Sequence, residues 1–323
     1  MKHILSLFLC FIFLCSFALA EGDYPVYTLK KRSRLPSFDP ALINQSGVKS
    51  TGADSITFND GAVLSFNEDA GLNYSRYNGM ATVYHINDGA TEQRPYDTLA
   101  GGIMKLGSQV YGGTLQDPMA DVPLREALSG ITLVQAQAQA EALFKALGIS
   151  DPVCAYALDM SLARIHALDA ADTGFRAIRY PYHLASGADE GYYMAYRARV
   201  DGAIATEGFF FAFLYVDSRG IAGLSLHSEY ALDQKVGTVR PQTSEAACIA
   251  DICQTYGVVP EDVRSTGIKL YAQWKNGQTR LLPYYTFRYD AAIFTGETLP
   301  MHAAYSILDG RLLFSGTGAH PAE

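Results

Sequence analysis

Apolar and polar residues alternate along much of the chain, and turn dipeptides interrupt the alternation. Asp-Gly or Asn-Gly occurs six times, and most of these pairs separate two apolar runs. Both dipeptides tolerate the positive φ angles that tight hairpin turns require. Early strands are expected over residues 55–58, 62–66 and 80–86. The pattern predicts mainly antiparallel β-structure connected by hairpins.

Two stretches have the period of an amphipathic helix instead. In the first, Thr132 is a candidate N-cap, Gln135 completes a capping box, and Gly148 ends the apolar repeat. The second stretch covers residues 243–257, and a shorter helix is expected near residues 123–128. Antiparallel sheets that are each packed by a helix belong to the α+β class, which is the fold class that we predict.

The two longer helices open stretches that share several features. Each helix is followed by a glycine, then a proline, and further on by a tyrosine pair at residues 192–193 or 284–285. In both stretches the first tyrosine lies 25 residues before an aspartate that opens a turn (217 − 192 for Asp217, 309 − 284 for Asp309). The shared order and spacing predict a duplicated α+β unit.

The chain is expected to divide into four segments. Residues 1–20 form a leader, residues 21–128 a β-rich N-terminal region, and residues 129–238 and 239–323 the two α+β units. Within the N-terminal region, residues 88–121 are rich in glycine and show no clear period. No element is predicted there.

The leader has the composition of a secretory signal peptide. Lys2 and His3 precede a long apolar stretch, which ends in the small-residue signal Ala18-Leu19-Ala20. Cleavage is therefore expected after Ala20, and the protein is expected to be secreted or at the cell surface. An uncleaved N-terminal anchor is the alternative, because residues 4–20 approach the length that spans a bilayer. No other stretch predicts an integral membrane segment.

Composition and charge narrow the classes of protein further. The chain is 49% hydrophobic and 18% charged, which is typical of a packed globular protein rather than a disordered one. Its formal net charge of −8 argues against a nucleic-acid partner. Outside the leader only Cys154, Cys248 and Cys253 remain, an odd number that excludes a complete disulfide framework and predicts free thiols.

A search for chemistry finds no local catalytic signature. The chain has no Gly-x-Ser-x-Gly elbow, no HExxH helix, no P-loop and no dinucleotide fingerprint. His227 and Glu229 would share one face of a strand, but no third ligand accompanies them. We therefore predict no catalytic residues, no metal site and no cofactor.

Tyrosine is unusually frequent, with 21 residues against a single tryptophan. Because a tyrosine ring joins a large apolar face to a polar hydroxyl, clustered tyrosines are candidates for a binding surface. The predicted binding residues are Tyr192, Tyr193, Tyr196, Tyr284 and Tyr285. The alternative is that these rings belong to the core, since aromatic residues also favour strands. Residues 209–214 are apolar on both faces, which predicts a central strand covered on both sides.

One pattern resembles known bacterial families. It consists of a threonine before an alanine-rich helix, then Tyr193, Tyr196-Arg197 and Val200-Asp201-Gly202, then Val216-Asp217 to Gly220-Ile221. In this order the motifs are similar to those of the PepSY and YycH/YycI-like extracytoplasmic proteins, over residues 130–315. The resemblance implies small α+β units that lie outside the membrane and act by binding, often by restraining a sensor or a protease.

These expectations combine into one functional hypothesis with two alternatives. The chain is expected to be a non-catalytic binding or regulatory protein of the bacterial cell envelope, with a protein or peptide as its partner. The first alternative is an extracellular hydrolase of glycans or peptides with dispersed carboxylates, which needs two carboxyls in a cleft and a raised pKa on one of them. The second is a carbohydrate-binding module, which would show a flat row of exposed rings.

Overall fold

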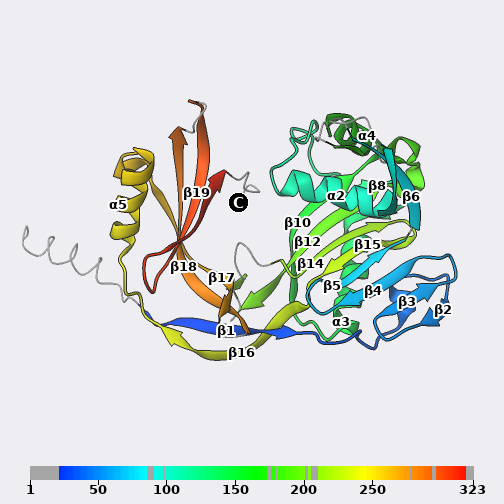
Figure 1. Ribbon diagram of the computed structural model, residues 1–323, viewed down its shortest axis with the longest axis horizontal. Helices are drawn as coiled ribbons and strands as arrows, with labels where there is room; N and C mark the ends of the chain where they lie inside the picture. Colours follow the sequence, from blue (N-terminus) through cyan, green and yellow to red (C-terminus); the bar gives the residue numbers. More distant parts are fainter. Residues whose placement is uncertain are drawn as a thin grey trace, which may run out of the picture. The chain divides into compact units, whose positions relative to one another are not determined.

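The computed structural model describes residues 22–76, 78–85, 91–97, 99–172, 176–178, 181–200, 203–204, 210–275, 278–292 and 296–317. The predicted signal peptide lies outside these ranges. Sheets and helices mix in an α+β fold with antiparallel pairing, as expected (Figure 1). In the described part of the chain, no helix combines the length and the hydropathy needed to cross a membrane.

The chain forms two compact units. The large unit contains residues 29–233, and the small unit contains residues 22–28 together with residues 234–317. These units do not follow the predicted segments. Strands from the predicted N-terminal region and from the predicted first α+β unit share one sheet in the large unit, where Leu224 pairs with Tyr74.

The main sheet of the large unit is antiparallel throughout. Its strand order is β10 (Pro152–Met160), β12 (Gly191–Val200), β14 (Ala212–Asp217), β15 (Gly220–Leu226), β5 (Gly71–Ser75), β4 (Val63–Asn67), β3 (Ser55–Phe58) and β2 (Val48–Thr51), and β13 (Ala203–Ile204) pairs with β12. The strands predicted over residues 55–58 and 62–66 are confirmed as β3 and β4. The strand predicted over residues 80–86 is β6, in a smaller sheet ordered β11 (Arg176–Ile178), β6 (Asn78–His85), β7 (Thr91–Asp97).

Helices cover both faces of the main sheet at β14. On one face lies α3 (Leu133–Ala146), whose Phe144 ring packs 5.1 Å from that of Phe211. On the other face lie α2 (Leu99–Tyr111) and α4 (Leu162–Ala171) (Figure 1). The helix predicted from Thr132 is confirmed, including its capping box with Gln135. The central strand predicted over residues 209–214 is confirmed in part. Residues 212–214 belong to β14, but Phe210 and Phe213 are only half-buried, and residue 209 lies outside the described ranges.

The sequence predicted neither α2 nor α4, and the helix expected near residues 123–128 is wrong. In its place a short hairpin forms between β8 (Ala127–Leu128) and β9 (Ile131–Thr132), and Gly130 takes a φ of 93° at the turn. The glycines of α2 lower its helix propensity, but they let it approach the sheet. A Cβ atom on Gly107 would lie 2.4 Å from the Tyr193 ring, so tertiary packing selects glycine there.

The small unit contains the second sheet. Its strands run β16 (Glu229–Val239), β1 (Tyr24–Lys31), β18 (Gln278–Ala292), β19 (Thr298–Ser306) and β20 (Leu312–Thr317), and β17 (Arg264–Lys275) pairs with the other side of β18. Helix α5 (Glu245–Tyr256) packs on one face and confirms the helix predicted over residues 243–257. Ser244 caps its N-terminus, and Gly257 ends it in the left-handed conformation with a φ of 69°.

The two units share an order of elements. Helix α3 is followed along the chain by the paired strands β10, β12, β14 and β15, and α5 is followed by β17, β18, β19 and β20. In both, an aspartate opens the last hairpin. Asp217 Oδ1 accepts from the Arg219 N–H at 2.8 Å, and Asp309 Oδ1 accepts from the Arg311 N–H at 3.2 Å. The predicted duplication of the sequence itself stays a prediction.

Short 3₁₀ turns complete the described elements. They are η1 (Pro40–Leu42), η2 (Pro181–Leu184), η3 (Gly187–Asp189) and η4 (Pro260–Asp262). Of these, η2 packs against α2. Its residue Tyr182 is fully buried, and a Cβ atom on Gly102 of α2 would lie 2.1 Å from the Tyr182 ring. A second glycine of α2 is therefore required by close packing.

Candidate binding surface

The five tyrosines predicted to bind a partner lie in the hydrophobic cores. Tyr192, Tyr193 and Tyr196 are fully buried on β12, and Tyr284 and Tyr285 are 7% and 6% exposed on β18. They do not form one exposed surface. On β12 the cause is the covering of both sheet faces, since Tyr193 packs under α2 and Tyr196 packs against Phe144 of α3.

The hydroxyl groups of these tyrosines have different partners. Tyr192 donates to the Arg125 carbonyl oxygen at 2.8 Å, and Tyr285 donates to the Thr243 carbonyl oxygen at 3.3 Å. The Tyr193 hydroxyl is buried and has no hydrogen-bond partner in the part of the chain that the structure describes. Burial raises the pKa of Tyr192 to about 12 and that of Tyr193 further still. The hydroxyl groups of Tyr192 and Tyr193 are therefore neutral at physiological pH.

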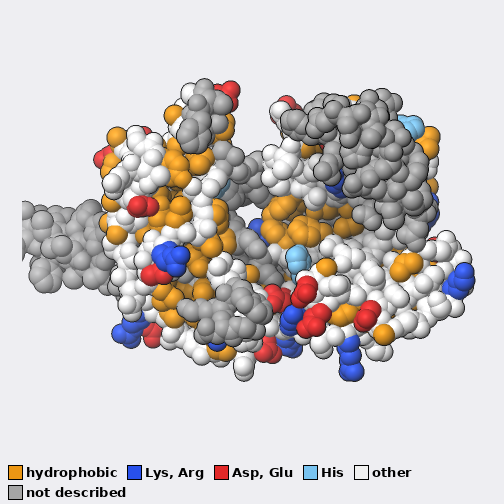
Figure 2. All heavy atoms as spheres, viewed as in Figure 1, with side chains coloured by type: hydrophobic (Ala, Val, Ile, Leu, Met, Phe, Trp, Pro, Cys, Tyr) orange, Lys and Arg blue, Asp and Glu red, His pale blue; other side chains and the backbone are white. Residues whose placement is uncertain are grey.

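Tyr193 is the base of a group of aromatic side chains that does reach the surface. Tyr111 ends α2, Tyr156 lies on β10, and Phe210 and Phe213 lie just before and within β14; all four are half-buried. We call these four residues the aromatic surface. Figure 2 shows hydrophobic side chains gathered over the strands labelled β10 and β12 in Figure 1.

The rings of the aromatic surface pack against one another. The Tyr111 centroid lies 4.8 Å from that of Tyr156 and 5.0 Å from that of Phe210. Phe213 lies 5.6 Å from Phe210 and stacks at 6.1 Å on the buried Tyr193. These are the distances of favourable aromatic pairs, so the rings hold one another in fixed positions while remaining half exposed.

A β-bulge brings Tyr156 to this surface. Cys154 pairs with Tyr196, but Tyr156 pairs with Ala195, because the register shifts between them. Residues two apart on a regular strand share a face, and the extra residue of a bulge breaks this rule. Tyr156 therefore points toward α2 and contacts Tyr111.

Arg197 borders the aromatic surface and supplies its one described cation–π contact. Its guanidinium carbon lies 4.3 Å from the centroid of the Phe210 ring, which is a favourable distance for this interaction. Its Nε atom is buried and has no hydrogen-bond partner among the described residues. The surface thus joins half-exposed rings to a cation.

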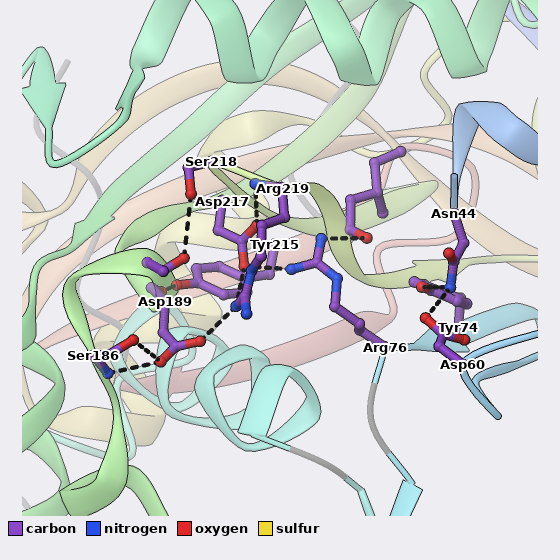
Figure 3. Close-up of polar contacts among 12 residues, drawn as sticks. Asn44, Asp60, Tyr74, Arg76, Ser186, Asp189, Tyr215, Asp217, Ser218 and Arg219 are labelled. Atoms are coloured by element: carbon purple, nitrogen blue, oxygen red, sulfur yellow. Dashed lines mark hydrogen bonds and ion pairs between the residues drawn. The ribbon is translucent and has the colours of Figure 1, made fainter. Parts of the chain in front are cut away.

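Two networks of aspartates and arginines lie elsewhere in the large unit. In the first, Asp217 is 1% exposed and binds Arg76 at 2.5 Å and Arg219 at 3.0 Å, and Arg219 also binds Asp189 (Figure 3). Burial alone would raise the pKa of Asp189, but hydrogen bonds from Ser186 and Arg219 outweigh it and lower the pKa below its usual value. This network fastens the β14–β15 hairpin to two other segments.

The second network is centred on Arg164, which is buried in α4. Its guanidinium binds the Asp159 carboxylate, lies 3.0 Å from Asp117 Oδ2, and donates to the Met119 carbonyl oxygen at 3.1 Å. The Asp159 side chain is 1% exposed, and its Oδ2 atom has no hydrogen-bond partner in the described ranges. The carboxylates that the fold brings close together therefore share an arginine in both networks.

The remaining candidates from the sequence are the pair His227 and Glu229 and the three cysteines. His227 and Glu229 lie near each other, and no three His, Cys, Asp or Glu side chains in the described ranges are grouped to hold a metal ion. The three cysteines of the described chain are free thiols. Burial raises the pKa of Cys248 to about 11, which keeps that thiol protonated at physiological pH.

Sequence reasoning missed the aromatic surface because its members are far apart in the chain. The apolar run at residues 209–214 was predicted to be packing, and Arg197 was noted only within a motif. The bulge that brings Tyr156 to the surface has no sequence signal that we could identify. Only the pairing of β10 with β12 and the position of α2 bring these residues together.

Comparison with known proteins leaves the family open. No protein-family model matches the chain, and no curated protein matches it. An uncharacterized protein from Eubacterium rectale is similar in structure at 11% identity and a TM-score of 0.45, covering 91% of this chain and 86% of that one. The Bacillus megaterium YpeB C-terminal domain is similar at 9% identity and a TM-score of 0.34, covering 87% of this chain and 94% of that domain. The resemblance to PepSY and YycH/YycI-like proteins stays a prediction.

Proposed function

We propose that the chain is a non-catalytic binding protein, and that its aromatic surface holds a peptide segment of a partner protein. The observation that carries this proposal is the group of four half-buried rings, packed on the buried Tyr193 and bordered by Arg197. Aromatic residues and arginine are enriched at protein interfaces and dominate their binding energy. A rigid aromatic group also loses little side-chain entropy when a partner binds.

The tilt of the rings favours a peptide over a sugar. Tyr111 is inclined by 57° to Tyr156 and by 79° to Phe210, and Phe210 is inclined by 33° to Phe213. A flat carbohydrate face needs rings that lie in one plane, whereas tilted rings form recesses for single apolar side chains. The geometry therefore supports peptide binding over the carbohydrate alternative.

The aspartates of the two networks support binding over hydrolysis. A hydrolase of the alternative kind needs one carboxyl with a raised pKa beside a second carboxyl. Here Asp117 and Asp159 both bind Arg164, and Asp189 and Asp217 both bind Arg219. At Asp189 the hydrogen bonds from Ser186 and Arg219 lower the pKa, which is the opposite of what a general acid requires.

The site of action proposed from the sequence is the bacterial cell envelope. The leader supports export, and cleavage after Ala20 would make Glu21 the first residue of the mature chain. N-terminal sequencing of the exported protein tests this. A sequence beginning at Glu21 agrees with secretion, and a retained Met1 on membrane-bound protein would establish the uncleaved anchor instead.

Selection of peptides tests the binding function. Random peptides displayed on phage are panned on the mature chain, and the most enriched peptide is synthesised and titrated by fluorescence anisotropy. We expect Phe210→Ala to weaken its binding at least about tenfold, the usual effect of removing a central interface residue. The matched control is Phe314→Ala, which removes a 40% exposed phenylalanine from the small unit and should leave affinity unchanged. Equal affinity of wild type and Phe210→Ala would overturn the proposal.

A further inference from the structure

We infer that the bound peptide carries a carboxylate next to its apolar anchor, and that Arg197 is the residue that recognises it. This inference rests on the proposed function, because it names the chemistry of the partner at the same surface. It follows from the position of Arg197, from its lack of an acidic partner among the described residues, and from a comparison with three other arginines of the large unit.

The position of Arg197 prepares its guanidinium to bind an anion. The residue lies on β12 opposite Val153, and its guanidinium stacks on Phe210 at 4.3 Å. Stacking uses the face of the planar group and leaves its N–H donors at the edge free to bind a carboxylate with two parallel hydrogen bonds. The half-buried side chain makes such a bond stronger than it would be in open solvent.

Three other arginines of this unit show what Arg197 lacks. Arg76, Arg164 and Arg219 each bind at least one aspartate. Arg197 has no ion pair with a described carboxylate, and its buried Nε atom has no hydrogen-bond partner in the described chain. In these three residues the guanidinium is neutralised by the fold itself. At the aromatic surface no described carboxylate pairs with Arg197, so we assign that carboxylate to the bound peptide.

The charged groups near the surface agree with this assignment. Asp117, Asp159 and Arg164 are the charged residues that act on Tyr156, and both aspartates bind Arg164. They therefore do not compete for the carboxylate's place beside Arg197. The apolar rings would hold a leucine or aromatic side chain of the peptide, and a neighbouring Asp or Glu side chain would reach the guanidinium.

The same phage selection tests this inference once it is repeated with Arg197→Met, which keeps the apolar length but removes the charge. We expect wild type to enrich peptides with Asp or Glu beside Leu, Phe, Tyr or Trp, and Arg197→Met to enrich the apolar residue without the acid. Replacing the acid of the best peptide by its amide should weaken binding to wild type about tenfold, the usual value of a charge-assisted hydrogen bond, and should not affect binding to Arg197→Met.

The outcomes separate the inference from the proposed function. Apolar peptides enriched by wild type without acids, and lost in Phe210→Ala, would overturn the inference and leave the proposed function standing. Equal enrichment by wild type and Phe210→Ala would overturn both. Arg197→Lys adds a geometric test, because lysine keeps the charge but has no planar group to stack. We expect it to recover less than half of the lost affinity, and full recovery would contradict recognition by a stacked guanidinium.

Discussion

Cys154 and Tyr156 lie two residues apart on β10 and face opposite sides of the same sheet. The bulge between them pairs Cys154 with Tyr196 on the α3 side and Tyr156 with Ala195 on the α2 side. Tyr196, the partner of Cys154, packs against Phe144 of α3, whereas Tyr156 packs on Tyr111 of α2. One extra residue thus moves an aromatic ring from the α3 side of the sheet to the candidate binding surface.

Loss of the hydroxyl group should change the free energy of unfolding in opposite directions at two adjacent tyrosines of β12. The Tyr193 hydroxyl is buried and has no hydrogen-bond partner among the described residues, and an unpaired buried hydroxyl costs about 1–3 kcal/mol. We predict that Tyr193→Phe raises the free energy of unfolding by about 1 kcal/mol. Tyr192→Phe removes the 2.8 Å hydrogen bond to Arg125 and should lower it by about 1 kcal/mol. Urea unfolding measures both, and a loss of stability in Tyr193→Phe would refute this description of its hydroxyl.

Close packing of α2 on the sheet predicts that alanine at position 107 lowers stability, although helix propensity alone would favour alanine over glycine. Gly107→Ala would place a Cβ atom 2.4 Å from the Tyr193 ring. Overpacking of this kind costs about 1–3 kcal/mol, whereas propensity alone would stabilise the helix by about 1 kcal/mol. We predict a lower thermal midpoint for Gly107→Ala and no change for Gly237→Ala, where nothing lies within 4 Å of the added atom. A higher midpoint for Gly107→Ala would show that α2 does not approach the sheet this closely.

The two hairpin aspartates should differ in their contribution to stability, although each makes the same kind of turn. Asp217 is buried and binds two arginines, so Asp217→Asn leaves the largely buried guanidinium of Arg76 without its ion pair and should cost about 3–5 kcal/mol. Asp309 is exposed, and an asparagine there keeps the acceptor of the turn. We predict a change within about 0.5 kcal/mol for Asp309→Asn. Equal costs in chemical denaturation would contradict the structural role given to Asp217.

The lowered pKa of Asp189 predicts that the contribution of this residue to stability is lost in acid. Its pKa is lower in the folded chain than its ordinary value of about 4, so its carboxylate stabilises the fold above that pH. This contribution is lost as the pH falls below 4 and through the folded pKa. Asp189→Asn should therefore be less stable than wild type at pH 6 and should lose less stability between about pH 4 and pH 2. Parallel pH profiles of the two thermal midpoints would rule out this contribution.

The sequence predicted those elements whose signals are local. Thr132 and Gln135 predict the start of α3, and Gly257 predicts the end of α5, because helix capping and a positive φ angle depend on a few adjacent residues. Helix α2 has no such signal. Its glycines at 102 and 107 are explained only by Tyr182 and Tyr193, which are distant in sequence.

The candidate surface shows the same limit. The sequence does not show whether the sheet face that carries a tyrosine is covered by a helix or open to solvent. The tyrosines at residues 192–196 were therefore predicted to bind, but they are buried. Tyr111 and Phe210 become neighbours only when α2 packs on β14. Their exposure depends on where a helix ends, which the pattern of residues 88–121 did not indicate.

Photo-crosslinking tests whether the aromatic surface holds the peptide. Phe210 and, separately, Phe314 are replaced by p-benzoylphenylalanine in the mature chain, and each protein is irradiated with the peptide selected on wild type. The claim that the aromatic surface holds the peptide predicts a crosslink from position 210 and none from position 314, with the adduct mapped by mass spectrometry. A crosslink from position 314 alone would place binding on the small unit and contradict the claim.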